Sequence, residues 1–193
     1  VTSIGWNAFN GCTGLTSVTI GSGVKSIKNG AFHSCTGLTN IVIPNSITSI
    51  EGSAFYSCTG LTSILIPNSV TSIEVAAFYG CTGLTCVTIP NSVTSIGQHA
   101  FRGCSGLKVV INCSNLTFSK GYSDYGYVAY YADKVINAPN GFVDGDFVFD
   151  GTNTLVAYLG NGGEVIIPDS YKGENYVIGE NVFSSCSGLT SVT

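Results

Sequence analysis

Residues 44–66 read PNSITSIEGSAFYSCTGLTSILI, and nearly the same 23 residues recur along the chain. Three slots show the register, because each holds one residue type in five successive copies: Phe9, Phe32, Phe55, Phe78 and Phe101; Cys12, Cys35, Cys58, Cys81 and Cys104; Leu15, Leu38, Leu61, Leu84 and Leu107. A fixed period of about 20 to 50 residues is typical of a solenoid. The chain is therefore predicted to stack one supersecondary unit on the next.

The hydrophobic spacing inside one unit predicts its elements. The run LTSILI at 61–66 alternates as a short, half-buried strand does, and Pro67 and Asn68 then turn the chain. The run VTSI at 70–73 continues as a short extended piece, and the apolar residues of 77–81 follow at the spacing of one helical face. Each unit is predicted to contain a strand, a turn, an extended piece and a short helix. The whole is predicted to be a right-handed α/β solenoid with a parallel strand ladder.

The repeat breaks after residue 111. Residues 112–140 hold five tyrosines within ten positions, and apolar side chains at i, i+3, i+4 and i+7 predict an amphipathic helix over 127–136: Val128, Tyr131, Ala132 and Val135. We interpret this segment as a cap on the open end of the first stack. An aromatic platform for a sugar or a peptide is the alternative interpretation of the tyrosines.

A second pattern follows the tyrosine-rich segment. The runs DFVFD at 146–150 and TLVAYL at 154–159 flank a turn, which predicts a β-hairpin at the start of a second stack. The run VIIP at 165–168 then restarts the repeat, and Cys186 returns in its slot. The predicted organisation has four parts: a repeat block at 1–111, a capping segment with a helix at 112–140, a hairpin at 141–163, and the start of a second repeat block at 164–193. Because the chain starts and stops inside a unit, we expect it to be a piece of a longer protein.

Composition excludes several classes of protein. The 193 residues are 44% hydrophobic and 9% charged, which is incompatible with a disordered chain, and no apolar run is long enough to span a membrane. The net charge is -4. Residues 1–111 carry four Lys or Arg against two Glu, and these scattered cations form no stripe that could follow a phosphate backbone. Nucleic acid is therefore not a predicted partner.

No group of residues predicts catalysis, a cofactor or a metal. The cysteines in the repeat slot are expected to form a column of buried thiols, and the absence of a CxxC pair argues against zinc; Cys86 and Cys113 lie outside that slot and are candidates for exposure. His33 and His99 occupy different slots, so the repeat does not bring them together. The acidic run DGDFVFDG at 144–151 lacks the ligand spacing of a calcium-binding EF-hand, and outward-facing carboxylates of a hairpin explain it better.

Two rows of slots remain as candidate binding surfaces. The outward slots of the main strands form the first row, which we call the strand-face row: Ser17, Thr19, Asn40, Val42, Ser63, Leu65, Cys86, Thr88, Val109 and Ile111. Its apolar members Val42, Leu65 and Ile111 are candidate contacts, although a parallel ladder also favours β-branched residues for purely structural reasons. A varied slot along the predicted helix edge forms the second row, which we call the outer-edge row: Asn10, His33, Tyr56, Tyr79 and Arg102. Tyr56, Tyr79 and Arg102 are candidates here because Tyr and Arg are favoured at interfaces.

The unit LxxIxLPxxVTSIxxxAFxxCTG resembles the repeat of the BspA-like leucine-rich repeat proteins. The resemblance covers residues 1–111 and 164–193, and it departs from the better-known leucine-rich pattern at the asparagine slot, where this chain has Ser46, Ser69 and Ser92. It implies a secreted or surface-anchored bacterial protein without catalytic activity, which binds host matrix proteins or proteins of neighbouring cells, or helps cells to co-aggregate. The alternatives are a passive spacer for another domain, a carbohydrate-binding module or an enzyme fragment.

Overall fold

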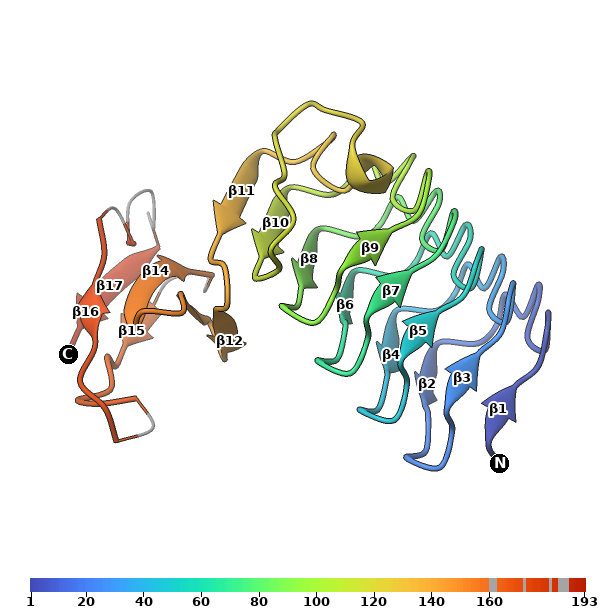
Figure 1. Ribbon diagram of the computed structural model, residues 1–193, viewed down its shortest axis with the longest axis horizontal. Coiled ribbons are helices and arrows are strands. Elements are labelled where there is room, and N and C mark those ends of the chain that lie inside the picture. Colours follow the sequence, from blue (N-terminus) through green and yellow to red (C-terminus); the bar gives the residue numbers. More distant parts are fainter. Residues whose placement is uncertain (160–162, 172, 181, 184–187) are drawn as a thin grey trace. The chain divides into compact units, whose positions relative to one another are not determined.

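The computed structural model describes residues 1–159, 163–171, 173–180, 182–183 and 188–193 (Figure 1). The chain forms two compact units, residues 1–137 and residues 138–193, and each is described here by itself.

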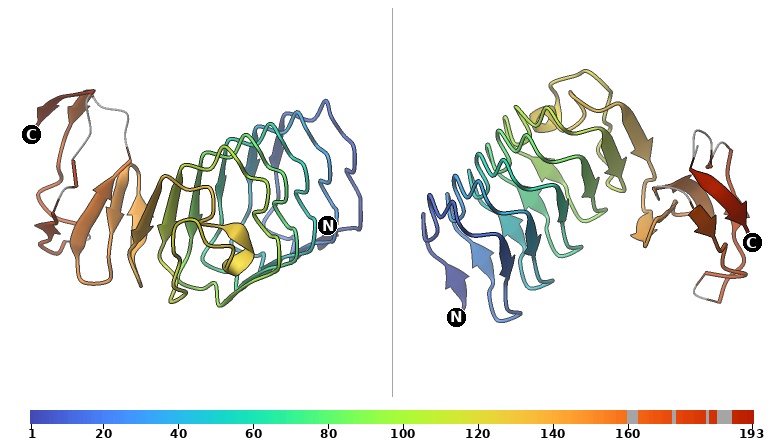
Figure 2. Two further views of the ribbon diagram at one scale, coloured as in Figure 1. Left: turned by 90° about the horizontal axis from the view of Figure 1, so that it is seen from above. Right: turned by 180° about the vertical axis from the view of Figure 1, so that it is seen from behind.

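Two columns of short parallel strands build the first unit, and Figure 2 shows their successive turns stacked on one another. The first column consists of two-residue strands in the order β1-β3-β5-β7-β9. These strands are the Ser-Ile pieces of successive repeats: β1 (Ser3–Ile4), β3 (Ser26–Ile27), β5 (Ser49–Ile50), β7 (Ser72–Ile73) and β9 (Ser95–Ile96). Their register advances by one repeat at each step, as in the pairing of Ile50 with Ile73.

The second column comes from the LxxIxL runs. It contains the pair β2-β4 and the four-stranded sheet β11-β10-β8-β6, in which all neighbours are parallel. The strands are β2 (Ser17–Thr19), β4 (Asn40–Val42), β6 (Ser63–Leu65), β8 (Cys86–Ile89), β10 (Val109–Asn112) and β11 (Lys134–Asn137). The predicted solenoid with a parallel ladder is confirmed, whereas its right-handed sense stays a prediction.

The predicted short helix in each repeat is wrong for the first unit, and its counterpart before Cys186 lies partly outside the described residues. Residues 7–12 show the actual conformation: the odd-numbered amides donate to carbonyls one repeat further on, at 2.7–3.1 Å, and the even-numbered amides donate back within the repeat, at 3.0–3.3 Å. Two slots per repeat have positive φ and reverse the chain locally, as at Ser53 and Ser57. An α-helix would direct every amide back along its own chain. Here half of the amides bind the next repeat, so the apolar side chains face the core from a series of turns.

The predicted helix over 127–136 is also wrong. The single helical element among the described residues is a three-residue 3-10 helix, η1 (Tyr125–Tyr127), with Gly126 at a φ of 66°. Residues Lys134–Asn137 instead form β11, which pairs with all four residues of β10. The open edge of β10 offers four residues of strand pairing, and this tertiary contact overrides the local helical pattern. Val128 and Ala132, which the pattern placed on the buried face, are indeed buried.

The core of the first unit is built from columns of identical side chains. The rings of Phe9, Phe32, Phe55, Phe78 and Phe101 stack with centroids 5.1–5.4 Å apart. The leucines at 38, 61, 84 and 107 are fully buried beside them. Each side chain therefore covers its equivalent in the next repeat, which a single repeat could not do alone.

Residues 112–137 supply the acceptors that another repeat would supply. The Phe101 amide donates to the Gly126 carbonyl at 2.7 Å, and the Gly103 amide donates to the Tyr131 hydroxyl at 3.1 Å. Phe118, Val128 and Ala129 belong to the same buried core as the repeats. One tyrosine of the tyrosine-rich segment therefore has a structural role at the end of the hydrogen-bond ladder.

The second unit begins with antiparallel strands and then returns to parallel pairing. Its main sheet has the order β12-β13-β14-β16, with β12 (Phe142–Asp144), β13 (Phe147–Phe149), β14 (Thr154–Tyr158) and β16 (Val177–Ile178). β12, β13 and β14 pair antiparallel, and β14 pairs with β16 in parallel. The strands β15 (Gly163–Val165) and β17 (Leu189–Val192) form a parallel pair. Cys186 lies outside the described residues, and the four-part division of the chain stays a prediction.

Ala76 provides a test of the turn conformation. It has a φ of 56°, a region that costs an L-residue about 1–2 kcal/mol, whereas the equivalent slot of an earlier repeat holds Gly30. Ala76→Gly removes this strain, but it also increases the conformational entropy of the unfolded chain, which offsets part of the gain. The net effect should be a rise in the free energy of unfolding of about 0.5–1 kcal/mol. The fully buried Ala77 is the matched control, because Ala77→Gly should lower this free energy. Urea unfolding of both variants measures the effect, and a destabilised Ala76→Gly protein would contradict the turn conformation.

Tyr131 provides a test of the end of the ladder. Tyr131→Phe keeps the ring and removes the acceptor of the Gly103 amide, so the hydrogen exchange of this amide should accelerate about fivefold, the equivalent of about 1 kcal/mol. Tyr122→Phe is the control, because the Tyr122 side chain is exposed. Equal exchange rates in the two variants would show that the hydroxyl does not close the ladder.

Candidate interaction surfaces

The outer-edge row forms an ordered stack on the surface of the first unit. The ring of His33 lies 4.7 Å from that of Tyr56, and Tyr56 lies 4.7 Å from Tyr79, with 2° between the ring planes in both pairs. All three side chains are half-buried, and Asn10 and Arg102 at the ends of the row are exposed. The repeat period thus places one variable side chain directly above the next.

The backbone ladder fixes this row. The carbonyls of Tyr56 and Tyr79 accept from the amides of Ser34 and Ser57, each at 2.7 Å, and the Arg102 carbonyl accepts from Gly80 at 2.8 Å. Each donor amide belongs to the residue that directly follows the row member of the preceding repeat. The side chains are therefore held on a rigid frame before any partner arrives.

The row continues into the tyrosine-rich segment, which the sequence did not predict. The guanidinium carbon of Arg102 lies 5.7 Å from the ring centroid of Tyr127, within the range of a cation–π contact. Tyr127 also contacts His99 and Tyr130, with ring centroids 5.7 and 5.3 Å away. The sequence held one usable signal: Tyr127 stands 25 residues after Arg102, close to one repeat.

The strand-face row is exposed in its middle and covered at one end. Leu65 and Val42 are 71% and 51% exposed, as predicted for outward slots. Ile111 is 1% exposed, so its prediction as a surface contact is wrong. Ile111 pairs in register with Thr88 on one side and with the buried Ile136 of β11 on the other. The sequence did not reveal β11, because its residues carry no repeat pattern.

Four cysteines of the repeat slot form the predicted buried column, whereas Cys12 is exposed, so the prediction is wrong for that copy. The thiols of Cys35, Cys58, Cys81 and Cys104 are buried, and each donates to the carbonyl of the phenylalanine 26 residues earlier, at 3.0–3.1 Å. Burial, reinforced by the neighbouring Cys35, raises the pKa of Cys58 to about 12. The Cys58 thiol is therefore a neutral, poorly nucleophilic member of the core.

The two cysteines outside the repeat slot differ from each other. Cys113 is 2% exposed, and burial raises its pKa to about 11, so its predicted exposure is wrong. Cys86 is half-buried on β8, and burial raises its pKa as well. The environments of both thiols argue against a reactive nucleophile.

Many of the hydroxyl groups also belong to the stack. Ser46, Ser69 and Ser92 each donate to a carbonyl of the preceding repeat, at 2.5–2.7 Å. These serines stand at the asparagine slot of the better-known leucine-rich pattern, and they bind the neighbouring repeat through a shorter side chain. The threonines at 39, 71, 85 and 94 donate in the same manner, at 3.0–3.3 Å.

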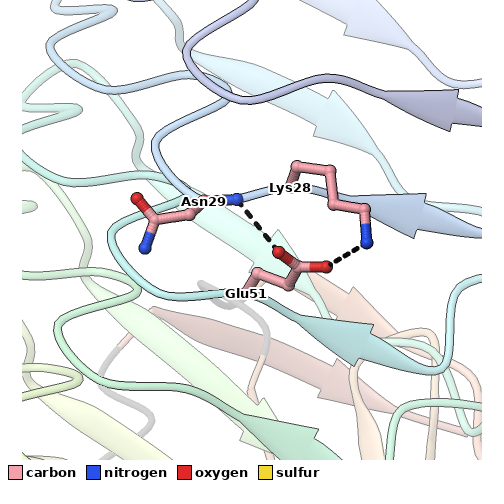
Figure 3. Close-up of polar contacts among 3 residues, drawn as sticks. All are labelled: Lys28, Asn29 and Glu51. Carbon is pink, nitrogen blue, oxygen red and sulfur yellow. Dashed lines mark hydrogen bonds and ion pairs between the residues drawn. The ribbon is translucent and has the colours of Figure 1, made fainter.

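One ion pair joins neighbouring repeats at the surface (Figure 3). The ammonium group of Lys28 lies 2.9 Å from one carboxylate oxygen of Glu51, and the other oxygen accepts from the Asn29 amide at 3.2 Å. Both side chains are partly exposed, so the pair contributes at most about 1 kcal/mol. We assign it to the stack.

The carboxylates of the acidic run in the second unit have separate environments. The Asp150 carboxylate accepts from the amide and hydroxyl of Thr152 at 2.8 Å and from the Thr154 amide at 3.0 Å. Partial burial acts to raise the pKa of Asp150, but these hydrogen bonds outweigh it and lower the pKa. Asp144 and Asp146 instead border an open groove of about 340 Å³. The described part of the chain contains no group of three His, Cys, Asp or Glu side chains that could hold a metal ion.

A family model now identifies the repeat. The model of the BspA type leucine-rich repeat region, with six copies, matches residues 1–130. The chain belongs to the BspA-type leucine-rich repeat family. No curated protein sequence matches the chain.

Three solved structures resemble this member of the BspA-type family. A leucine-rich repeat protein of T. pallidum is 32% identical, with a TM-score of 0.58, over 71% of this chain and 66% of the other. A leucine-rich repeat protein of Bacteroides ovatus is 24% identical, with a TM-score of 0.52, over 100% of this chain and 64% of the other. A leucine-rich cell surface protein of Faecalibacterium prausnitzii is 25% identical, with a TM-score of 0.52, over 100% of this chain and 58% of the other. The chain thus spans less than two thirds of the length of these relatives. Within its described residues, no helix is long and apolar enough to cross a membrane.

Thiol alkylation tests the cysteine assignments. At about pH 8, iodoacetamide should leave Cys58 and Cys113 unmodified in the folded protein, because both are buried and carry raised pKa values. Both should react once guanidinium unfolds the chain, which provides the internal control. Peptide mass spectrometry identifies the alkylated cysteines. Alkylation of Cys113 in the folded protein would contradict its burial and support the exposure that its sequence position predicted.

Proposed function

We propose that this BspA-type chain is a non-catalytic interaction module of a secreted or surface-anchored protein, which adheres to proteins of a host or of neighbouring cells. The observation that carries the proposal is the outer-edge row. This slot holds four residue types in five copies, its side chains reach the solvent, and the row continues into a second aromatic cluster around Tyr127.

The order of the row favours binding. The stacked rings of His33, Tyr56 and Tyr79 are already fixed by their neighbours and by the backbone ladder. A partner therefore immobilises few additional rotamers, and this lowers the entropic cost of association. Tyrosine and arginine also contribute large contact areas and directed hydrogen bonds at interfaces.

The strand-face row is the second candidate surface. Leu65 is 71% exposed and Val42 is 51% exposed on neighbouring repeats of the second strand column. Exposed aliphatic side chains surrounded by hydroxyl groups form an apolar centre with a polar rim, which is the usual composition of a protein interface.

Two further observations support a surface protein without catalysis. The relative from Faecalibacterium prausnitzii is described as a cell surface protein, and we extend this location to the present chain as part of the proposal. The His33 ring lies 2.9 Å from the Ser34 hydroxyl. No contact of this ring with a carboxylate occurs among the described residues, so the orienting member of a catalytic triad is missing there.

Capture of purified extracellular-matrix proteins tests the proposal and separates the two surfaces. The full chain is compared with Tyr56→Ser/Tyr79→Ser/Arg102→Gln, with Val42→Thr/Leu65→Thr, and with Tyr122→Ser as a control for an exposed tyrosine outside both rows. The variant of the surface in use should bind at least about tenfold more weakly, because truncation of an interface tyrosine or arginine commonly costs more than 1 kcal/mol. Unfolding midpoints confirm that each variant is folded. Unchanged binding by both row variants would exclude both surfaces, and a complete lack of capture by the wild-type chain would favour a passive spacer.

A further inference from the structure

We propose that the outer-edge row receives an extended, acidic segment of a partner protein, with Arg102 as the anchor for a carboxylate. This inference rests on the proposed interaction function and names the chemistry of the partner.

The stacking of the row decides which groups a ligand can reach. The rings of His33, Tyr56 and Tyr79 lie 4.7 Å apart and almost parallel, so each inner ring face is covered by its neighbour. A sugar ring needs an open aromatic face, and the stack does not provide one between its members. The outward edges, with the hydroxyl groups of the two tyrosines, remain accessible.

The tyrosine hydroxyls are free to bind a partner. Neither Tyr56 nor Tyr79 has a side-chain hydrogen bond within the described protein, and the same part of the chain contains no buried polar atom without a partner. Both hydroxyls must therefore contact solvent. Each can donate a hydrogen bond to a carbonyl or carboxylate oxygen.

Arg102 gives the row its charge. Its side chain is exposed, and its guanidinium group lies over the Tyr127 ring, 5.7 Å from the centroid. Among the described residues the one ion pair is that of Lys28 with Glu51, so Arg102 has no carboxylate partner there. A guanidinium group that is positioned but not neutralised suits bidentate binding of a carboxylate.

The charge of the unit favours the same partner. Residues 1–137 carry six Lys or Arg against four Asp or Glu, whereas residues 138–193 carry one Lys against seven. The outer-edge row therefore lies on the unit with a net charge of +2, within a chain of net charge -4. Charge complementarity directs an acidic partner to the first unit.

The dimensions fit a short extended peptide. The row advances by 4.7 Å from His33 to Tyr56 and again to Tyr79, and Arg102 stands one repeat further on. An extended chain rises about 3.3 Å per residue, so a segment of about four to six residues follows the row. Its carboxylate would bind Arg102, while its carbonyl oxygens would accept from the tyrosine hydroxyls.

Fluorescence anisotropy with three labelled octapeptides, alternating Glu-Ser, Gln-Ser and Lys-Ser, tests this inference on the full chain. The Glu-Ser peptide should bind about tenfold more tightly than the Gln-Ser peptide. Arg102→Gln should remove this preference, and Arg102→Glu should transfer it to the Lys-Ser peptide. Lys134→Gln is the matched control, because Lys134 is an exposed cation of the same unit outside the row, and it should leave the preference unchanged.

Three results would overturn the inference. Equal affinity for the Glu-Ser and Gln-Ser peptides would exclude a carboxylate partner, and an equal loss in Arg102→Gln and Lys134→Gln would show general attraction to a basic surface. A change of sedimenting mass in Arg102→Glu without a change in peptide binding would identify a second copy of the chain as the occupant. The proposed function has a separate readout, because loss of matrix-protein capture by the triple row variant would support it even if the acidic peptide failed to bind.

Discussion

The structure of the first unit depends on the backbone hydrogen bonds that join one repeat to the next. In one such bond per repeat, the amide of each core phenylalanine from Phe9 to Phe78 donates to a backbone carbonyl of the next repeat, and the Phe101 amide donates to Gly126, at 2.7–2.8 Å. This bond sets the spacing between repeats. It thereby brings the phenylalanine rings to 5.1–5.4 Å and places each cysteine thiol of the core against a carbonyl. The columns of the core are consequences of a backbone ladder.

The same ladder determines which residues are available for binding. Phenylalanine and cysteine face inward, and the serine and threonine hydroxyls described above reach the preceding repeat. The slot after each phenylalanine faces outward, and its side chain carries no bond that the stack requires. We therefore expect variation at Tyr56, Tyr79 and Arg102 to leave the fold intact, and a fixed spacing presents these side chains as an ordered row.

The failures of the sequence interpretation share a physical origin. The spacing of Ala77, Phe78 and Cys81 fits one face of a helix, but it fits equally a series of turns whose inward residues have the same separation. The turns form because half of their backbone amides donate to carbonyls of the neighbouring repeat. Ile111 and Cys113 were expected at the surface, and both are buried in and next to β10, where β11 supplies an unpredicted neighbouring strand.

The sequence by itself determined the period, the parallel ladder, the buried slots and the two rows of outward side chains, because a repeat places equivalent residues on equivalent sites of a stack. The tertiary structure alone decided the backbone conformation of each turn, the covering of Ile111, and the meeting of Arg102 with Tyr127. The last two features depend on contacts between segments that share no repeat pattern. The first depends on whether a backbone amide donates to a carbonyl of its own repeat or of the next repeat. Periodicity carries no information on either.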